Sequence, residues 1–182
     1  MAADPPEQPP GTRPNHAAWI AFLHALVAGL AGVPALVTSL GLPTITNEAD
    51  PNATQPGWIA DQAYGQPLRA YRGEREQQVM LIESALDRLQ RNGAAGAWLA
   101  AYADYPTALW RTPPLDRAIR ERTLGLVDVS GREKPAADTL RRFAAERRTV
   151  RQVAPPIEAD PERYWRDPQR ELARLWREFT TD

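Results

Sequence analysis

The sequence predicts an α/β fold with parallel strands, and three observations lead to this prediction. Two short apolar runs, 33–37 and 96–102, have the length of strands. The first run ends at Thr38 and Ser39 before a Leu-Gly-Leu-Pro turn, as a strand buried on both faces would. Helical periodicity precedes each run, and the resulting order of helix, strand, loop, helix, strand, loop and helix is typical of βα units.

The composition fits one soluble domain and excludes several classes of site. Of 182 residues, 43% are hydrophobic and 25% charged, and a formal charge of -1 predicts neither a nucleic-acid nor a membrane partner. Cysteine is absent, which excludes disulfides, a thiolate zinc site and a Cys nucleophile. His16 and His24 share no metal-ligand spacing. No metal or other cofactor is therefore predicted.

The chain begins with a Pro-rich segment, 1–14, which is predicted to be a flexible leader. It lacks the basic start of a secretory signal, so a cytoplasmic location is the default expectation. Residues 15–150 are predicted to form the α/β domain. Residues 151–182 are predicted to be a helical extension in which the Asp160-Pro161 pair begins a last helix with aromatic core anchors.

Within the α/β domain, the sequence predicts helices before and after each strand. The first runs from Asn15 to a stop at Gly32, the second covers 74–92, and the third begins at Pro135 and continues to about residue 148. Between Pro43 and Tyr71 no periodicity is sustained, and this segment is expected to be either a functional loop or a mobile excursion.

Two strands cannot close a parallel sheet, because each crossover helix needs a wider sheet to cover. Few other strand candidates are present, apart from a short extended piece at 127–129. The sequence therefore predicts the last quarter or third of a larger α/β barrel.

Two segments of the chain resemble one enzyme family. The segment GVPALVTSLGLPT, 32–44, is similar to the seventh-strand segment of (β/α)8 glycoside hydrolases of the cellulase and mannanase type, that is, glycoside hydrolase family 5 and its clan relatives. Residues 93–144 resemble the eighth-strand region of the same family, with its Ala-Asp-Tyr turn, Leu-Trp, Pro-Pro-Leu-Asp, Gly-Leu and Lys-Pro motifs. The resemblance covers 17–144 and implies a partial (β/α)8 TIM barrel comprising strands seven and eight.

The resemblance also implies where catalysis would occur. Retaining members use two carboxyl groups roughly 5 Å apart. The acid/base glutamate would end the fourth strand, which this chain does not contain, and Ser39 occupies the nucleophile position. A serine without an adjacent base cannot replace that carboxylate. Glu48, in an Asn-Glu pair, is a weaker catalytic candidate, because it lies in a polar loop where a solvated side chain is expected.

The resemblance also implies aromatic side chains at the substrate site, because the family uses the faces of such side chains to stack on sugar rings. Trp98 lies two residues before the position expected for the eighth-strand tryptophan, which Ala100 occupies. Trp98 and four residues of the following turn are the candidate substrate-binding residues: Tyr102, Asp104, Tyr105 and Trp110. For Trp110, core packing is the alternative.

Two functions follow from these expectations. The first is a glycoside-hydrolase-related, carbohydrate-active polypeptide, truncated or catalytically degenerate, that binds an oligo- or polysaccharide but is inactive as an isolated chain. The second is an interaction module that docks on a separately encoded amino-terminal half-barrel, or associates with itself, to complete a glycosidase-like fold.

Overall fold

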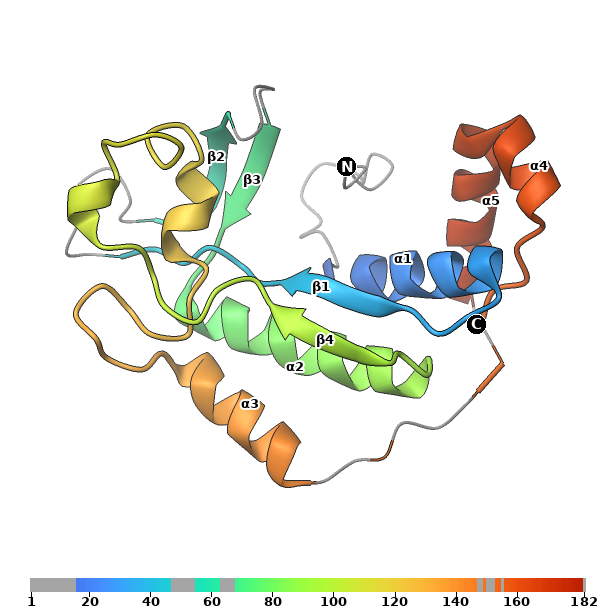
Figure 1. Ribbon diagram of the computed structural model, residues 1–182, viewed down its shortest axis with the longest axis horizontal. Coiled ribbons are helices and arrows are strands. Elements are labelled where there is room, and N and C mark those ends of the chain that lie inside the picture. Colours follow the sequence, from blue (N-terminus) through green and yellow to red (C-terminus); the bar gives the residue numbers. More distant parts are fainter. Residues whose placement is uncertain are drawn as a thin grey trace. The chain divides into compact units, whose positions relative to one another are not determined.

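A computed structural model describes residues 16–46, 55–62, 68–146, 149, 153, 154 and 156–181 (Figure 1). The predicted leader and Glu48 lie outside the described residues. The chain forms two compact units. The first consists of the described residues within Met1–Val37, Ser84–Ala97 and Thr149–Asp182, and the second of those within Thr38–Glu83 and Trp98–Arg148.

No helix among the described residues is both long and apolar enough to cross a membrane.

The predicted alternation of helices and strands is confirmed. The elements follow in the order α1 (His16–Ala31), β1 (Leu36–Leu40), β2 (Gly57–Asp61), β3 (Leu68–Arg72), α2 (Arg75–Arg91), β4 (Gly96–Leu99), the 3-10 helices η2 (Thr107–Leu109) and η3 (Ile119–Thr123), α3 (Pro135–Ala145), α4 (Pro161–Arg166) and α5 (Pro168–Thr181).

The strands β1 and β4 form a two-stranded sheet and run in the same direction (Figure 1). The backbone N–H of Ala100 donates to the carbonyl of Leu40 over 2.9 Å. In a parallel ladder this bond places Gly41 beside Ala100 and, two residues earlier, Ser39 beside Trp98. A Cβ atom added to Gly41 would lie 3.1 Å from the Cβ of Ala100, in agreement with this register.

The prediction that the first strand is buried on both faces is wrong. The strand starts at Leu36, two residues after Pro34, whose missing N–H keeps it out of a ladder. Val33 and Leu36 are exposed, whereas Leu40 is fully buried. The described residues leave the start of the strand uncovered, so only its far end is part of a core.

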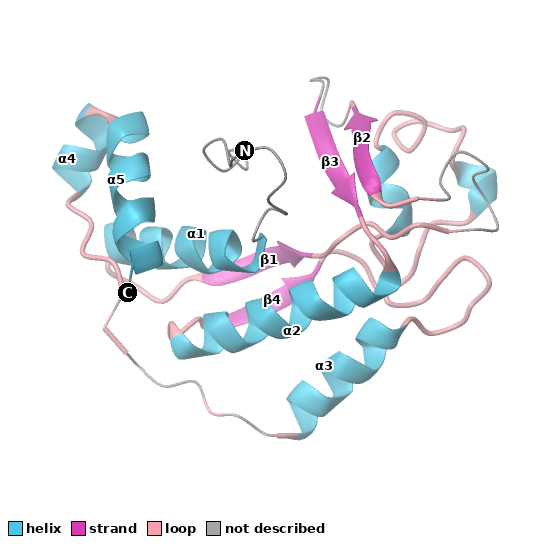
Figure 2. Ribbon diagram, turned by 180° about the vertical axis from the view of Figure 1, so that it is seen from behind, coloured by secondary structure: helices cyan, strands magenta, loops and turns pink. Residues whose placement is uncertain are grey.

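The prediction of an irregular segment from Pro43 to Tyr71 is wrong for residues 57–61 and 68–71. The strands β2 and β3 form an antiparallel hairpin (Figure 2). Trp58 lies opposite Tyr71 with the ring centroids 5.7 Å apart, and the guanidinium of Arg69 lies over the Trp58 ring. Each strand has five residues, which is too short for periodicity to show, so these cross-strand contacts decide the pairing.

Helix α1 contributes several of the buried apolar residues of the first unit. It ends at Ala31, and Gly32 follows with a φ of 66° that suits a glycine and an N–H that donates to the carbonyl of Ala28. Trp19 and Phe22 of α1 pack in one cluster with α5 residues, which include Trp176 and Phe179.

The predicted last helix is two helices, α4 and α5. The chain leaves helical geometry at Asp167, since the residue before a proline is disfavoured in the α region, and Pro168 starts the second helix. Trp165 is 71% exposed, so the prediction that it anchors the core is wrong. Tyr164 packs against the core cluster, as predicted.

Candidate functional site

The structure brings Ser39 and Trp98 together. They are lateral neighbours on β1 and β4, so their side chains point to the same face of the sheet, about 5 Å apart at the backbone. Both are exposed, Trp98 to 64%. The tryptophan thus stands beside the position that the resemblance assigns to the nucleophile, while Ala100 stands beside Gly41.

The turn after β4 carries two further exposed aromatic residues. Tyr102 is 78% exposed and Tyr105 is also exposed. The polar backbone of this turn is held by the 126–128 segment, because Asp104 N–H donates to the carbonyl of Val127 over 2.8 Å. Substrate contact by Trp98, Tyr102 and Tyr105 stays a prediction, and all three rings are accessible for it.

Asp104 is buried in an ion pair with Lys134. Its Oδ1 lies 2.7 Å from Lys134 Nζ and accepts the N–H of Gly125 over 2.8 Å. The ammonium also donates to Thr44 Oγ1 over 2.9 Å and to the carbonyl of Thr123 over 3.1 Å. We refer to Lys134, Asp104, Thr44 and Thr123 as the Lys134 cluster. Burial raises the pKa of Asp104 and lowers that of Lys134, while the charge of each partner opposes the shift.

The Lys134 cluster explains why the motifs of this region occur together. It joins the loop after β1, which carries Thr44, to the turn after β4 and to the start of α3. Gly125 is required at this junction, since an added Cβ would lie 2.3 Å from the carbonyl carbon of Ala103. The Asp104 carboxylate is therefore occupied by the protein rather than presented to solvent.

Trp110 is also occupied by the protein. It is buried, its Nε1–H donates to the carbonyl of Tyr105 over 2.8 Å, and the Arg122 guanidinium lies 5.4 Å from the ring centroid. The structure therefore shows core packing for Trp110, which was the alternative to substrate binding. Trp110 supports the turn that carries Tyr105.

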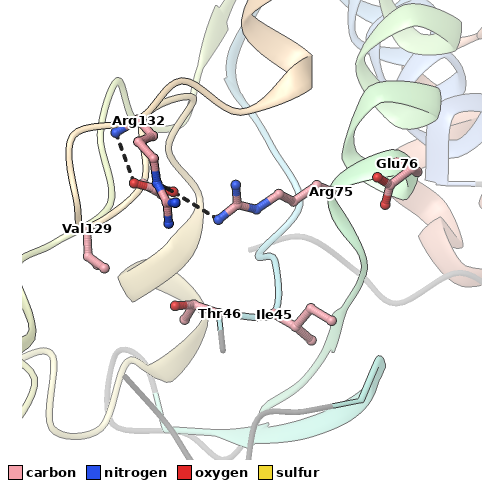
Figure 3. Close-up of a pocket in the computed structure, with 7 residues that line it drawn as sticks. Ile45, Thr46, Arg75, Glu76, Val129 and Arg132 are labelled. Carbon is pink, nitrogen blue, oxygen red and sulfur yellow. Dashed lines mark hydrogen bonds and ion pairs between the residues drawn. The ribbon is translucent and has the colours of Figure 1, made fainter. Parts of the chain in front are cut away.

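A polar cavity of about 190 Å³ lies beside the loop after β1 (Figure 3). We refer to it as the Asp128 pocket. It is lined by Ile45, Thr46, Arg75, Glu76, Asp128, Val129 and Arg132.

The carboxylate of Asp128 organises this pocket. Its Oδ1 accepts the N–H groups of Ser130 and Arg132 and the hydroxyl of Ser130, and its Oδ2 accepts from Arg75 over 3.0 Å. Burial alone would raise the pKa of Asp128, but these hydrogen bonds outweigh it and hold the pKa well below its usual range.

The sequence analysis did not identify Lys134, Arg75 or Asp128 as site residues. A local signal existed for Asp128, because an Asp followed two residues later by Ser and then Gly is typical of a turn closed by its own side chain. Lys134 offered no comparable signal, since its partners lie 11 to 90 residues away. The described residues contain no cluster of side chains able to hold a metal ion.

No protein-family model and no curated protein matches this chain. Among solved structures, it is similar to GH5_18, a glycoside hydrolase family 5 protein from Bifidobacterium longum subsp. longum ATCC 55813, with a TM-score of 0.53 and 17% identity over 78% of this chain. It is similar to a variant of that protein in complex with Manb1-4GlcNAc, with a TM-score of 0.52 and 17% identity over 79% of this chain.

The chain spans 28% of the length of each of these two structures. At 17% identity the likeness concerns the fold alone. The likeness supports the prediction that this chain forms part of a family 5 barrel. The described residues contain no complete barrel. The separate prediction of a truncated or degenerate enzyme stays a prediction.

Proposed function

We propose that this chain is the carboxyl-terminal portion of a glycoside-hydrolase-related barrel and that it binds an oligosaccharide on the sheet face that carries Ser39 and Trp98. The observation that carries the proposal is the register of β1 and β4, which sets an exposed indole beside Ser39. An indole face is an apolar platform for a sugar ring, and the hydroxyl of Ser39 can hydrogen-bond a sugar hydroxyl.

Binding without hydrolysis is expected for the chain by itself. Retaining glycosidases need a carboxylate nucleophile and a second carboxyl group about 5 Å away. Ser39 supplies a neutral hydroxyl instead. We expect no turnover of mannan, xylan, β-glucan or aryl glycosides, and none after Ser39→Glu, because the acid/base group is still missing. Turnover that disappears in Glu48→Gln would contradict this and assign catalysis to Glu48.

The first ligand to test is the disaccharide Manb1-4GlcNAc, which is bound by a protein of similar fold. Tryptophan fluorescence and isothermal titration calorimetry would measure its dissociation constant for the wild type and for Trp98→Ala. We expect Trp98→Ala to weaken binding by about tenfold, since a tenfold loss corresponds to ~1.4 kcal/mol, which is within the range of aromatic stacking.

Trp165→Ala is the matched control, because Trp165 is similarly exposed but belongs to the other unit. It should bind as the wild type does. Equal affinity of Trp98→Ala and Trp165→Ala would contradict the proposed sugar-binding face.

A second candidate function, docking on a separately encoded half-barrel, is favoured by the edges of the sheet. In the described residues β1 and β4 pair only with each other, so each keeps one unpaired edge. Leu36, the first residue of β1, is exposed, and so is Val33 just before the strand. Open edges with apolar side chains promote pairing with another chain. Light scattering would test this function: self-association or capture of a half-barrel supports it, and a monodisperse monomer with a cooperative thermal transition contradicts it.

A further inference from the structure

One face of the β2–β3 hairpin carries aromatic and cationic side chains that the proposed sugar-binding face does not use. Residues opposite one another on antiparallel strands point to the same face, and so do residues two apart on one strand. The register pairs Trp58 with Tyr71 and Ala60 with Arg69, so these four side chains share a face, which we call the Trp58 face. We propose that the Trp58 face binds an acidic sugar, a hexuronate residue of an oligosaccharide. This proposal does not depend on the proposed function.

The opposite face of the hairpin is anchored to the protein. Asp61 points to that face, and its side chain is fully buried. Its Oδ1 accepts the N–H of Ile119 over 2.8 Å, and Arg120 Nε lies 3.4 Å from its Oδ2. These contacts hold β2 against η3, whereas Trp58 and Arg69 on the Trp58 face are exposed. A ligand would therefore not have to order the strands before binding to this face.

The guanidinium of Arg69 is available to an anion. It lies over the Trp58 ring, 5.7 Å from the centroid, and it forms no ion pair or hydrogen bond with the described residues. A stacked guanidinium uses its flat face for the ring and keeps its N–H donors in its own plane, where two parallel hydrogen bonds can hold a carboxylate. Asp61 is the only acidic residue of the two strands, and it is buried on the other face. The positive charge of Arg69 is thus not neutralised by the strands that carry it.

The indole of Trp58 supplies the apolar part of the site. Trp58 is 52% exposed, although Arg69 lies over its ring and the Tyr71 ring meets it at 76°. The C–H groups of a pyranose ring need only part of an indole surface, whereas a nucleotide base stacks on a whole open face. A hexuronate joins such a pyranose ring to a carboxylate. It therefore matches both the indole and the guanidinium, whereas a neutral sugar lacks the carboxylate and a simple carboxylate lacks the ring.

Isothermal titration calorimetry on the full chain, at constant ionic strength, would compare four probes: methyl β-glucuronide, methyl β-glucoside, acetate and AMP. The glucoside is the matched control, because it differs from the glucuronide only in having a hydroxymethyl group in place of the carboxylate. We expect the glucuronide to bind with a dissociation constant on the order of 1 mM, at least about tenfold more tightly than the other probes. No binding of the glucuronide up to about 20 mM, or equal binding of the glucoside or acetate, overturns the proposal. Tighter binding of AMP overturns it in favour of a nucleotide.

Amide chemical shifts of the full chain would show where the glucuronide binds. Changes at residues 57–61 and 68–72 support the Trp58 face. Changes confined to the surroundings of Ser39 and Trp98 overturn the proposal and assign the glucuronide to the proposed sugar-binding face instead. The two sites are thereby tested separately.

Two variants of Arg69 would test the guanidinium. Arg69 is exposed, so the fold should tolerate both changes. Arg69→Gln should weaken glucuronide binding about tenfold, and Arg69→Lys should keep only part of the affinity, because an ammonium has the charge without the planar pair of donors. Arg111→Gln removes an exposed arginine of the same unit that lies outside the hairpin, and it should leave binding unchanged. An unchanged affinity in Arg69→Gln, or an equal loss in Arg111→Gln, overturns the proposal.

Discussion

In the first unit the packed interior is an aromatic and aliphatic cluster between α1 and α5, whereas the second unit buries a lysine and three aspartates among its described residues. In the first, Trp19, Phe22 and Trp176 meet with ring centroids 5.1 to 5.2 Å apart. In the second, the ammonium of Lys134 has three oxygen acceptors at fixed positions.

This difference predicts different tolerance to substitution. Apolar packing is non-directional, so a residue of another shape keeps much of the stabilisation. A buried ion pair is directional, and removal of one partner leaves an uncompensated charge in a medium of low polarity. The four predictions below test that difference, from the largest expected effect to the smallest.

Lys134→Met should have the largest effect on the free energy of unfolding. It leaves the carboxylate of Asp104 buried without its partner, which should cost about 3–5 kcal/mol in urea denaturation followed by circular dichroism. The double variant Lys134→Met/Asp104→Leu should recover part of this loss, because no buried charge remains. A loss below about 1 kcal/mol in the single variant would mean that the pair contributes no more than a surface salt bridge does.

Phe22→Leu tests the aromatic cluster of the other unit. Phe22 is fully buried, but leucine keeps most of the apolar contact, so we expect a loss of about 1–2 kcal/mol in the same assay. Phe22→Ala should cost more, about 3–5 kcal/mol, because it leaves a cavity. If the leucine variant were as unstable as the alanine variant, the cluster would depend on exact shape, and the contrast between the units would be wrong.

Acid should destabilise the chain through Asp128. Its pKa is lowered by folding, so its contribution to stability is present above the unfolded pKa of about 3.9 and is lost as pH falls toward the lower folded value. Urea denaturation from pH 6 to pH 3 should show a smaller loss of stability in Asp128→Asn than in the wild type. Asp138→Asn, with an exposed carboxylate, is the control and should follow the wild-type slope.

Trp98→Ala should have the smallest effect on stability, about 0.5 kcal/mol or less, because most of the side chain is in solvent. Thermal denaturation of this variant also decides whether a loss of sugar binding reflects the missing indole. A large drop in melting temperature would show instead that Trp98 is packed in solution, and the proposed face would then be closed.

The sequence by itself determined the elements whose signals are local. Apolar spacing and a glycine stop were enough for α1, and charge on one face with an Asn-Gly stop was enough for α2, which ends at Arg91 as predicted to within one residue. Pro135 marked the start of α3 correctly, although the helix ends at Ala145, earlier than predicted. Helices are predictable in this way because their hydrogen bonds and side-chain faces depend on residues three and four apart.

Only the tertiary structure decided the arrangements that depend on distant residues. The β2–β3 hairpin, the neighbourhood of Ser39 and Trp98, and the Lys134 cluster join positions 7 to 90 residues apart. Trp110 and Asp104 have the residue types of a sugar site, yet burial against Arg122 and Lys134 assigns them to the protein interior. The sequence supplies the side chains, but register and desolvation decide which of them reach a ligand, because both arise only when separate segments pack together.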